Sequence, residues 1–564
     1  MSIESPARSG WGRLGDSPNP IWIRELKQSA RLTRTPWILT TLTILMTLLI
    51  ATIGGVMSSE AAPATTGVVL FQVYFSIAFF VVSLIGPAVA ANSIASEREG
   101  RTWEAVLLTG LSPGVVCRGK FLAAFTSIGM YIVMLAPVGA VPFLFGGVTA
   151  TETVVAFAFL FLIALLSVAF GLAVSSKMSS VRAAIVVTLL LAFPVSLAAF
   201  LAFGPGLSVV AHRLWPGVPE GPPIWLPVAY ERAPFDFSYM AFLLLVPVVV
   251  TVLPAWFLYE VTVANLTSVT DDRSTGLKRW FLVATPVLTG CAALVVTSVP
   301  VTSTLAMTVA ASAALFAYLS FNVFLFLGDP IGPSRRVVAQ WDLAGAGRFR
   351  RFLGPGTARS SMLELLAGGG ALVMLTGLGM FLTSSASGRI DATAVGAFGA
   401  YSLAFLMFMV GLGAYLRARS DTPLVARVLL LAILFGVAVV PWVIAAVAGL
   451  LSDHGGKDAV IVGAPSPFYV FVMLDAISRG GSHGQVVAGM ACALGWAILG
   501  AVLLGAAWSR GNGIIKKHAE LLEETDRLLA AEDDRTLAVA GAPDTPLEPA
   551  QPEGEAAAPP LAEP

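Results

Sequence analysis

The sequence predicts an all-α integral membrane protein with about twelve transmembrane helices. Of its 564 residues, 56% are hydrophobic and only 12% are charged, and the mean hydropathy is +0.82. A bilayer core about 30 Å thick requires roughly 20 apolar residues for each crossing helix, and stretches of this length recur along the chain. The 34 Lys and Arg residues balance 34 Asp and Glu residues, which argues against a nucleic-acid-binding protein.

Twelve apolar stretches qualify as spans in a window of about 19 residues. They cover residues 37–57, 68–91, 121–145, 153–174, 183–203, 239–264, 281–299, 305–327, 363–382, 393–416, 428–449 and 486–508. The first stretch comes after a basic lead-in, as a signal peptide would. It is not a short apolar core with a small-residue cleavage site behind it, so we interpret it as a true span.

The distribution of basic residues predicts the orientation. With a cytoplasmic N-terminus and twelve spans, the outer segments contain few of the 34 Lys and Arg residues. These few are Arg213, Arg232, Arg389, Lys457 and Arg479. Cytoplasmic loops of membrane proteins are rich in Lys and Arg, so we expect both termini to be cytoplasmic in a multi-pass protein of the plasma (cell inner) membrane.

The layout of the spans predicts two six-helix halves, covering residues 37–264 and 281–508 and joined by a cytoplasmic linker at 265–280. Each half has a basic lead-in, a long inner loop after its second span and a long outer loop before its sixth span. Weak symmetry of this kind is typical of duplicated transporters, here as parallel repeats. The alternative is that any twelve helices can be divided into sixes.

The two ends of the chain lie outside the predicted membrane region. We expect residues 1–36 to be a cytoplasmic segment with an interfacial helix. Residues 509–532 have apolar residues at helical spacing, which predicts a helical stub. The Ala/Pro/Glu-rich tail at 533–564 is predicted to be disordered. The three cysteines, Cys117, Cys291 and Cys492, are far apart and adjoin apolar runs, which predicts buried thiols and neither disulfides nor a metal cluster.

The predicted spans contain no Asp, Glu, Lys, Arg or His in the bilayer interior, and Glu260 lies close to a cytoplasmic end. Charged groups at depth are typical of proton relays and ion sites, so we do not expect a proton-driven mechanism, although sodium coupling through neutral oxygens stays open.

The chain also lacks the phosphate-binding G-x-x-x-x-G-K-[ST] motif and H-E-x-x-H, so we expect no enzyme and no catalytic residue. One outer loop carries Asp453, His454, Asp475 and His483. Their spacing matches no set of metal ligands.

The first long inner loop contains a dense run of mixed charge, Ser96-Glu97-Arg98-Glu99-Gly100-Arg101-Thr102-Trp103-Glu104, followed by apolar residues through Leu107 and Leu108. A single interfacial helix here would place Glu97, Arg101 and Glu104 on one face by their i, i+4, i+7 spacing. Leu108 would then lie near the bilayer. Periodicity alone leaves open an ordinary interfacial helix whose charges are simply solvated.

The loop resembles the signature of ABC-2 type transporter permeases. The matching residues are Glu97-Arg98-Glu99-Gly100-Arg101-Thr102, then Leu107-Leu108-Thr109-Gly110-Leu111-Ser112-Pro113, then Gly119-Lys120. The lead-in Asn19-Pro20-Ile21-Trp22-Ile23-Arg24-Glu25-Leu26, with Asn19 as N-cap and Pro20 at the first helical position, is similar to the N-terminal interfacial helix of the family. The resemblance covers about residues 19–264.

The resemblance implies the permease subunit of an ABC transporter, most often an exporter, which binds a separate ATPase subunit, in two copies, through this loop as a coupling helix. ATP and Mg would bind to that partner, and this chain would hold no cofactor or metal of its own. Partner contacts are then expected at Glu97, Arg98, Glu99, Arg101, Thr102 and Glu104, with Trp103, Leu107 and Leu108 as apolar anchor, and an interfacial helix bearing Asn19, Pro20, Arg24 and Glu25. Nothing in the sequence indicates the substrate.

The corresponding loop of the second half departs from this pattern. Residues 328–361 lack the acidic run, contain several Gly and Pro residues, and carry six arginines against Asp329 and Asp342. Family permeases typically have six spans and work as dimers, so a fused pair with a degenerate second docking site is one interpretation. The alternatives are a basic loop lying on anionic membrane lipid, a homodimer of the whole chain, an ATP-independent carrier or channel, and a membrane enzyme or assembly scaffold.

Overall fold

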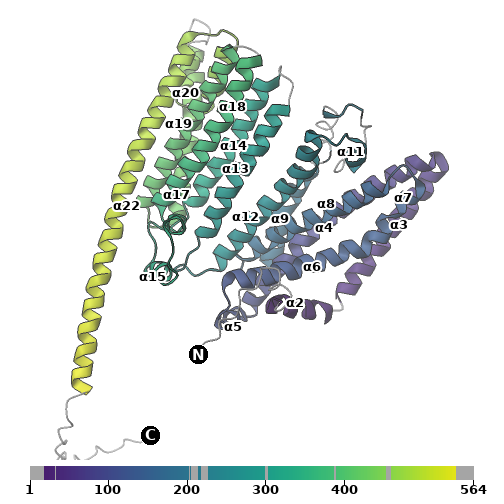
Figure 1. Ribbon diagram of the computed structural model, residues 1–564, viewed down its shortest axis with the longest axis horizontal. Helices are drawn as coiled ribbons and strands as arrows, with labels where there is room; N and C mark the ends of the chain where they lie inside the picture. Colours follow the sequence, from purple (N-terminus) through teal and green to yellow (C-terminus); the bar gives the residue numbers. More distant parts are fainter. Residues whose placement is uncertain are drawn as a thin grey trace, which may run out of the picture. The chain divides into compact units, whose positions relative to one another are not determined.

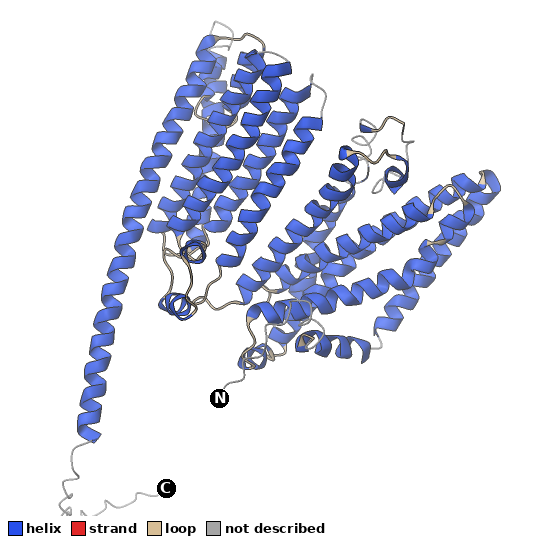
Figure 2. Ribbon diagram, viewed as in Figure 1, coloured by secondary structure: helices blue, strands red, loops and turns tan. Residues whose placement is uncertain are grey.

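The computed structural model is mostly helical in the residues it describes, and those residues contain no β-strand (Figures 1 and 2). The described residues are 18–31, 34–201, 204, 214–217, 227–298, 303–386, 389–451 and 459–540. Among them, twelve helices are long and apolar enough to cross a membrane. The chain is therefore an all-α, multi-pass membrane protein, as predicted.

Each of the twelve predicted spans corresponds to one of these helical segments. In chain order they are α3 (Arg34–Glu60), α4 (Pro63–Glu99), α6 (Pro113–Gly139) with α7 (Val141–Phe145), α8 (Ala150–Ser175), α9 (Val181–Leu201), η2 (Tyr239–Leu245) with α12 (Val246–Leu266), α13 (Thr275–Ser298), α14 (Thr304–Phe326), α17 (Thr357–Leu363) with η4 (Glu364–Gly369) and α18 (Gly370–Ala386), α19 (Arg389–Arg419), α20 (Pro423–Leu451) and α22 (His483–Ala540). Several are longer than their apolar stretch, because a helix can continue beyond the hydrocarbon with its backbone hydrogen bonds intact.

Short helices occupy the connections. They are α2 (Pro20–Arg31), α5 (Trp103–Leu108), α11 (Pro227–Arg232), α15 (Arg335–Leu343), α16 (Arg348–Phe352), the 3₁₀ segment η5 (Ala459–Gly463) and α21 (Tyr469–Ser478). The sequence did not predict α21, which lies in a long outer loop. Its Val470 and Met473 are buried against Phe398 and Tyr401 of α19, so this part of the loop is packed onto the spans.

The spans form two large apolar cores. One is built from α4, α6 and α8, with contributions from α3 and α12. The other is built mainly from α13, α14, α18 and α19, with α12 and α20 at its margin. Small residues allow close approach: a Cβ at Gly171 of α8 would lie 2.8 Å from Ala90 of α4. Small residues thus form the packing surface between α4 and α8 at this position.

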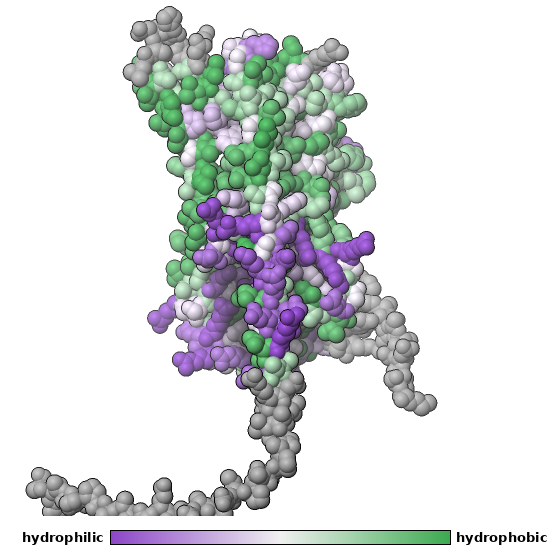
Figure 3. Space-filling view, turned by 90° about the vertical axis from the view of Figure 1, so that its left-hand side faces the viewer, coloured by the Kyte–Doolittle hydropathy of each residue, from purple (hydrophilic) through white to green (hydrophobic). Residues whose placement is uncertain are grey.

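The outer surface of the spans is apolar, as a lipid-facing surface requires. Figure 3 shows one face on which hydrophobic side chains gather over the spans. Exposed apolar residues such as Leu190, Phe193 and Phe435 belong to this surface. The cysteines carry no disulfide: all three are free, and Cys117 is buried.

The chain divides into two compact units, Met1–Ala507 and Trp508–Pro564. In the second unit, the predicted stub is helical and is the continuation of α22, which ends at Ala540 and not near 532. Its surface carries i, i+4 ion pairs such as Arg527 with Glu523, 2.8 Å apart. The rest of the predicted tail lies outside the described residues.

One carboxyl at the edge of a predicted span is buried in the structure. The ninth span begins at Thr357, earlier than its apolar stretch, and Glu364 lies within it with 2% of its surface exposed. The hydropathy of the sequence placed this carboxyl at the edge of the predicted span. The reason is that the preceding turn of α17 is rich in Ser and Thr, which lower the hydropathy there. Glu364 is therefore an ionisable group inside a predicted transmembrane helix.

Candidate docking site

The N-terminal helix α2 begins as the sequence predicted. The Asn19 side chain accepts a hydrogen bond from the Ile21 backbone N–H (3.0 Å), and Pro20 occupies the first helical position. The Asn19 amide also donates to the carbonyl of Val115 at 2.8 Å, and Trp22 Nε1 donates to Thr126 Oγ1 at 3.3 Å. These contacts hold α2 along the first turns of α6.

Gly119 of α6 makes this contact possible. A Cβ at this position would lie 2.7 Å from Asn19 Oδ1 and 2.7 Å from Ile21 Cβ, closer than real Cβ contacts allow. The glycine of the Gly119-Lys120 pair therefore has a packing role: it permits α2 to lie directly on the α6 backbone.

Lys120 forms a buried cluster of charged and polar groups with Arg24, Glu25, Ser93 and Glu97, called here the Lys120 cluster. Its Nζ lies 3.0 Å from Glu25 Oε1 and 3.1 Å from Glu97 Oε1, and it donates to the Ser93 carbonyl at 3.0 Å. The Lys120 side chain is fully buried. Arg24 pairs with Glu97 from α2. The cluster thus joins α2, the end of α4 and the start of α6.

The electrostatics of the cluster favour the charged form of Glu25. Burial raises the pKa of this carboxyl, but the Lys120 charge and the hydrogen bonds from Lys120 and Arg24 outweigh burial and hold the pKa below its usual value. Burial lowers the pKa of Arg24, and its bonds to Glu25 and Glu97 more than offset this, so that the pKa is raised. Both groups are charged at neutral pH.

Two further residues of the acidic run also bond inside the chain. Glu99 Oε2 accepts from the backbone N–H of Val181 at 2.7 Å, which satisfies a free donor at the start of α9. Arg98 donates to the Met178 carbonyl at 3.4 Å, and its guanidinium lies 5.7 Å from the centre of the Trp103 ring. The end of α4 is thereby tied to the α8–α9 connection.

The predicted single helix over the acidic run is wrong. Helix α4 ends at Glu99 and α5 begins at Trp103, with a turn at Gly100 and Arg101 between them. Arg101 has a φ of 55°, in the left-handed region that non-glycine residues seldom adopt. Because of this turn, Glu97 and Glu104 lie on different helices and do not share a face.

Helix α5 has one packed side and one exposed side. Val106 is buried against Ile21 of α2 and Val116 of α6, and Trp103 is partly buried beside them. Leu108 is 88% exposed, so Val106 takes the anchoring place expected of Leu108. Arg101, Thr102 and Glu104 are exposed as well. The side chain of Leu107 lies outside the described residues.

A different buried cluster lies at the start of α13 and α17. Lys278 Nζ is 2.8 Å from Asp329 Oδ2, and Ser274 Oγ donates to Asp329 Oδ1 at 2.7 Å. Ser360 Oγ also donates to Asp329, and Arg417 Nε donates to the Asp329 carbonyl at 3.1 Å. These five residues, called the Asp329 cluster, join α13, α14, α17 and α19.

The basic loop at residues 328–361 contains short helices and ion pairs. It contains α15 and α16, and two of its arginines form ion pairs, Arg336 with Asp271 (3.0 Å) and Arg351 with Asp342 (2.8 Å). Arg359 lies over the Trp341 ring at 5.3 Å. Glycine again permits the packing, since a Cβ at Gly354 would collide with Trp341.

The outer-loop residues do not form a site within the described part of the chain. Asp453 and His454 lie outside the described residues, Asp475 pairs with Arg479 at 3.0 Å, and His483 is the first residue of α22. No group of three or more His, Cys, Asp or Glu side chains that could hold a metal ion is present among the described residues.

Known protein families and curated proteins give no match to this chain. The structure brings together four residues that the sequence singled out: Asn19, Arg24, Glu25 and Glu97. It leaves Arg101, Glu104 and Leu108 exposed on the adjoining turn and on α5. The sequence reasoning missed the counter-ion role of Lys120, for which a lone lysine directly after a glycine at the start of an apolar span was the available signal.

Proposed function

We propose that this chain is the membrane-spanning subunit of an ABC transporter, of the exporter type, with two six-span parts and both termini in the cytoplasm. The observation that carries the proposal is α5. It connects the second and third spans, it is anchored by Val106 against α2 and α6, and it turns Arg101, Glu104 and Leu108 outward. A short anchored helix with an exposed mixed surface suits contact with a separate ATPase subunit.

The Lys120 cluster gives this helix a mechanical connection to the spans. A movement of α5 would act through Val106 on α2 and α6, while the ion pairs of Lys120 hold α2, α4 and α6 together. Packed helices with two arrangements are the usual elements of such transitions. Glu97 and Glu99 are engaged inside the chain, so we assign the main docking contacts to Arg101, Glu104 and Leu108.

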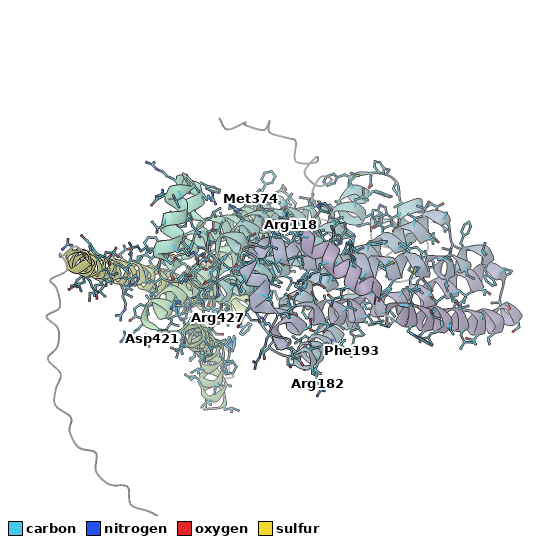
Figure 4. All side chains as sticks on the ribbon, turned by 90° about the horizontal axis from the view of Figure 1, so that it is seen from below. Arg118, Arg182, Phe193, Met374, Asp421 and Arg427 are labelled. Carbon is cyan, nitrogen blue, oxygen red and sulfur yellow. The ribbon has the colours of Figure 1, made fainter. Side chains whose placement is uncertain are left out.

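Copurification tests the proposal. The detergent-solubilised wild type should retain an ATPase, measured as ATP hydrolysis in the eluate, and Glu104→Lys and Leu108→Glu should lose it while remaining folded. Asp421→Lys is the matched control, because Asp421 is an exposed acidic residue in another inner connection (Figure 4). Absence of an ATPase with the wild type in several mild detergents, or equal loss in the control, would reject the docking assignment.

A second candidate function is a carrier driven by an ion gradient. Glu364 favours it, because ionisable residues within spans are typical of ion and proton pathways. Transport by the purified chain in vesicles, with an imposed gradient and no ATPase, would support this candidate.

A further inference from the structure

Glu364 is a buried carboxyl inside a span. It follows the start of α17 by two helical turns, about 10 Å along the helix axis. Its Oε1 is buried and has no hydrogen-bond partner among the described residues. A buried carboxylate without a partner is costly in an apolar environment, so the group needs a neutralising cation or a proton.

The neighbouring helices do not supply that cation in the described structure. Segment η4 packs against α13, α14, α17, α18 and α19. The titratable side chains described on these helices are Lys278, Arg279, Cys291, Tyr318, Arg359, Asp391, Tyr401, Tyr415, Arg417 and Arg419. Lys278 and Arg417 bond to the Asp329 cluster, and Arg359 bonds to the carbonyl of Arg351 at 2.8 Å. The Tyr318 hydroxyl lies 3.3 Å from Thr285 Oγ1.

A small cavity lies beside the carboxyl. It has a volume of about 20 Å³, and Glu364 lines it together with Thr357, Ser360 and Ser361. A space of this size holds about one water molecule or a small ion. Ser360 Oγ, which also lines the cavity, donates its proton to Asp329, and a hydroxyl oxygen that donates can still accept a hydrogen bond or bind a cation.

The cavity is connected to the Asp329 cluster. Ser360 lines the cavity and donates its hydroxyl to Asp329, which is paired with the buried Lys278. Ser360 therefore belongs both to the lining of the cavity and to the Asp329 cluster. The chain also changes to π-helical geometry at Glu364, and such segments are frequent at functional sites because they displace backbone groups from the regular pattern.

We propose that Glu364, with the hydroxyls of Thr357 and Ser360, is an exchangeable binding site for one monovalent cation, either a proton or Na⁺. One carboxylate among neutral oxygens provides a single negative charge, and no cluster of three acidic, His or Cys ligands for a polyvalent metal is found among the described residues. The proton requires only the carboxyl, whereas Na⁺ would also use the hydroxyl oxygens. The site does not depend on the ATPase partner.

Infrared spectroscopy of the full-length protein in lipid films tests the site, because a protonated carboxyl has a C=O stretching band that the carboxylate lacks. Glu364→Gln should remove one such band from the wild-type spectrum, and Glu364→Asp should restore a shifted one. Glu152→Gln is the control: Glu152 is also buried and its Oε1 also has no partner among the described residues, but its Oε2 accepts the Thr149 N–H in a capping box. A band that Glu152→Gln removes would belong to Glu152 and not to Glu364.

The titration identifies the occupant. A Glu364 band that decreases as pH is raised, and is insensitive to Na⁺, supports a proton site. A band that Na⁺ removes at constant pH, with K⁺ or choline as the ionic-strength control, supports a Na⁺ site. A wild-type spectrum without a Glu364 band at any pH, or with a band that neither pH nor Na⁺ changes, would overturn the proposal and leave Glu364 as a structural group.

Discussion

Lys120 Nζ lies 3.1 Å from Glu97 Oε1, so the lysine at the start of the third span neutralises the acidic run at the end of the second. The same amine lies 3.0 Å from Glu25 on α2, and its side chain is fully buried. One lysine thus links three helices that are distant in sequence. Helix α5 packs on two of these helices, since Val106 is buried against Ile21 of α2 and Val116 of α6.

Lys120→Met should strongly destabilise the first spans. The substitution keeps an aliphatic chain but leaves Glu25 and Glu97 without their shared counter-ion, and breaking a buried pair on one side typically costs about 3–5 kcal/mol. The free energy of unfolding in mixed micelles measures the effect. Arg118→Met is the matched control, since Arg118 is an exposed basic residue on the same turn of α6 (Figure 4). Equal losses in both variants would contradict the role of Lys120.

Neutralising a carboxylate should partly rescue this variant. Adding Glu97→Gln to Lys120→Met removes one of the two carboxylates that the lysine neutralises, so the double variant should be less destabilised than the sum of the two single variants. Strict additivity would show that Lys120 and Glu97 do not interact energetically, despite their separation in the structure.

Gly119→Ala should loosen α2 from α6. The added methyl group would meet Asn19 Oδ1 and Ile21 Cβ at 2.7 Å, and crowding of this kind typically costs about 1–3 kcal/mol. Proteolysis within α2, followed by mass spectrometry, reports its release. Gly114→Ala, on the same helix, has open space around its Cβ and should leave α2 protected. Release in both variants would point to a general loss of α6 stability.

The sequence predicted the spans well because the apolar requirement of a bilayer is local and strong. It also predicted the Asn19 cap, since Asn followed by Pro is a local signal for a helix start. It did not predict the break before α5. Helical spacing continued through Arg101, although Gly100, which is the C-cap of α4, was a local stop signal. The left-handed conformation of Arg101 and the packing of α5 on α2 and α6 are not visible in the spacing.

The burial of Glu364 was missed for a related reason. The turn that precedes it contains Thr357, Ser360 and Ser361, which lower the hydropathy and place the predicted start of the span too late. The Ser360 and Ser361 hydroxyls bond to backbone carbonyls of the same helix or to Asp329, and the Thr357 hydroxyl donates to the Pro330 carbonyl at 3.3 Å, so the polar turn is satisfied inside the protein. Hydropathy cannot distinguish such a turn from a solvated one.

Arg101→Gly should separate backbone strain from partner contact. A left-handed φ costs a non-glycine residue about 1–2 kcal/mol, whereas glycine adopts it freely. We expect Arg101→Gly to be about 1 kcal/mol more stable than Arg101→Ala, a difference that thermal unfolding measures. If the guanidinium contacts the ATPase, both variants lose ATPase capture to the same extent. Capture that follows stability instead would assign Arg101 to the turn alone.

Acid should release α2 through Glu25. The pKa of this carboxyl is held below its usual value in the folded protein, so its stabilising contribution is complete above the unfolded pKa of about 4.3 and is lost as the pH falls through the lower folded pKa. Amide protection of α2, from hydrogen exchange corrected for intrinsic rates, should stay constant from neutral pH to about pH 5 and decrease below about pH 4.

Glu25→Gln removes the titrating group and provides the control for this decrease. It should show weaker protection of α2 at neutral pH, because Lys120 loses one of its two carboxylate partners, and less change with acid. The part of the acid response that persists in this variant belongs to other carboxylates, of which Glu97 is the nearest in the cluster. A wild-type loss of protection already near neutral pH would contradict the assignment, because a carboxyl with a lowered pKa is fully ionised there.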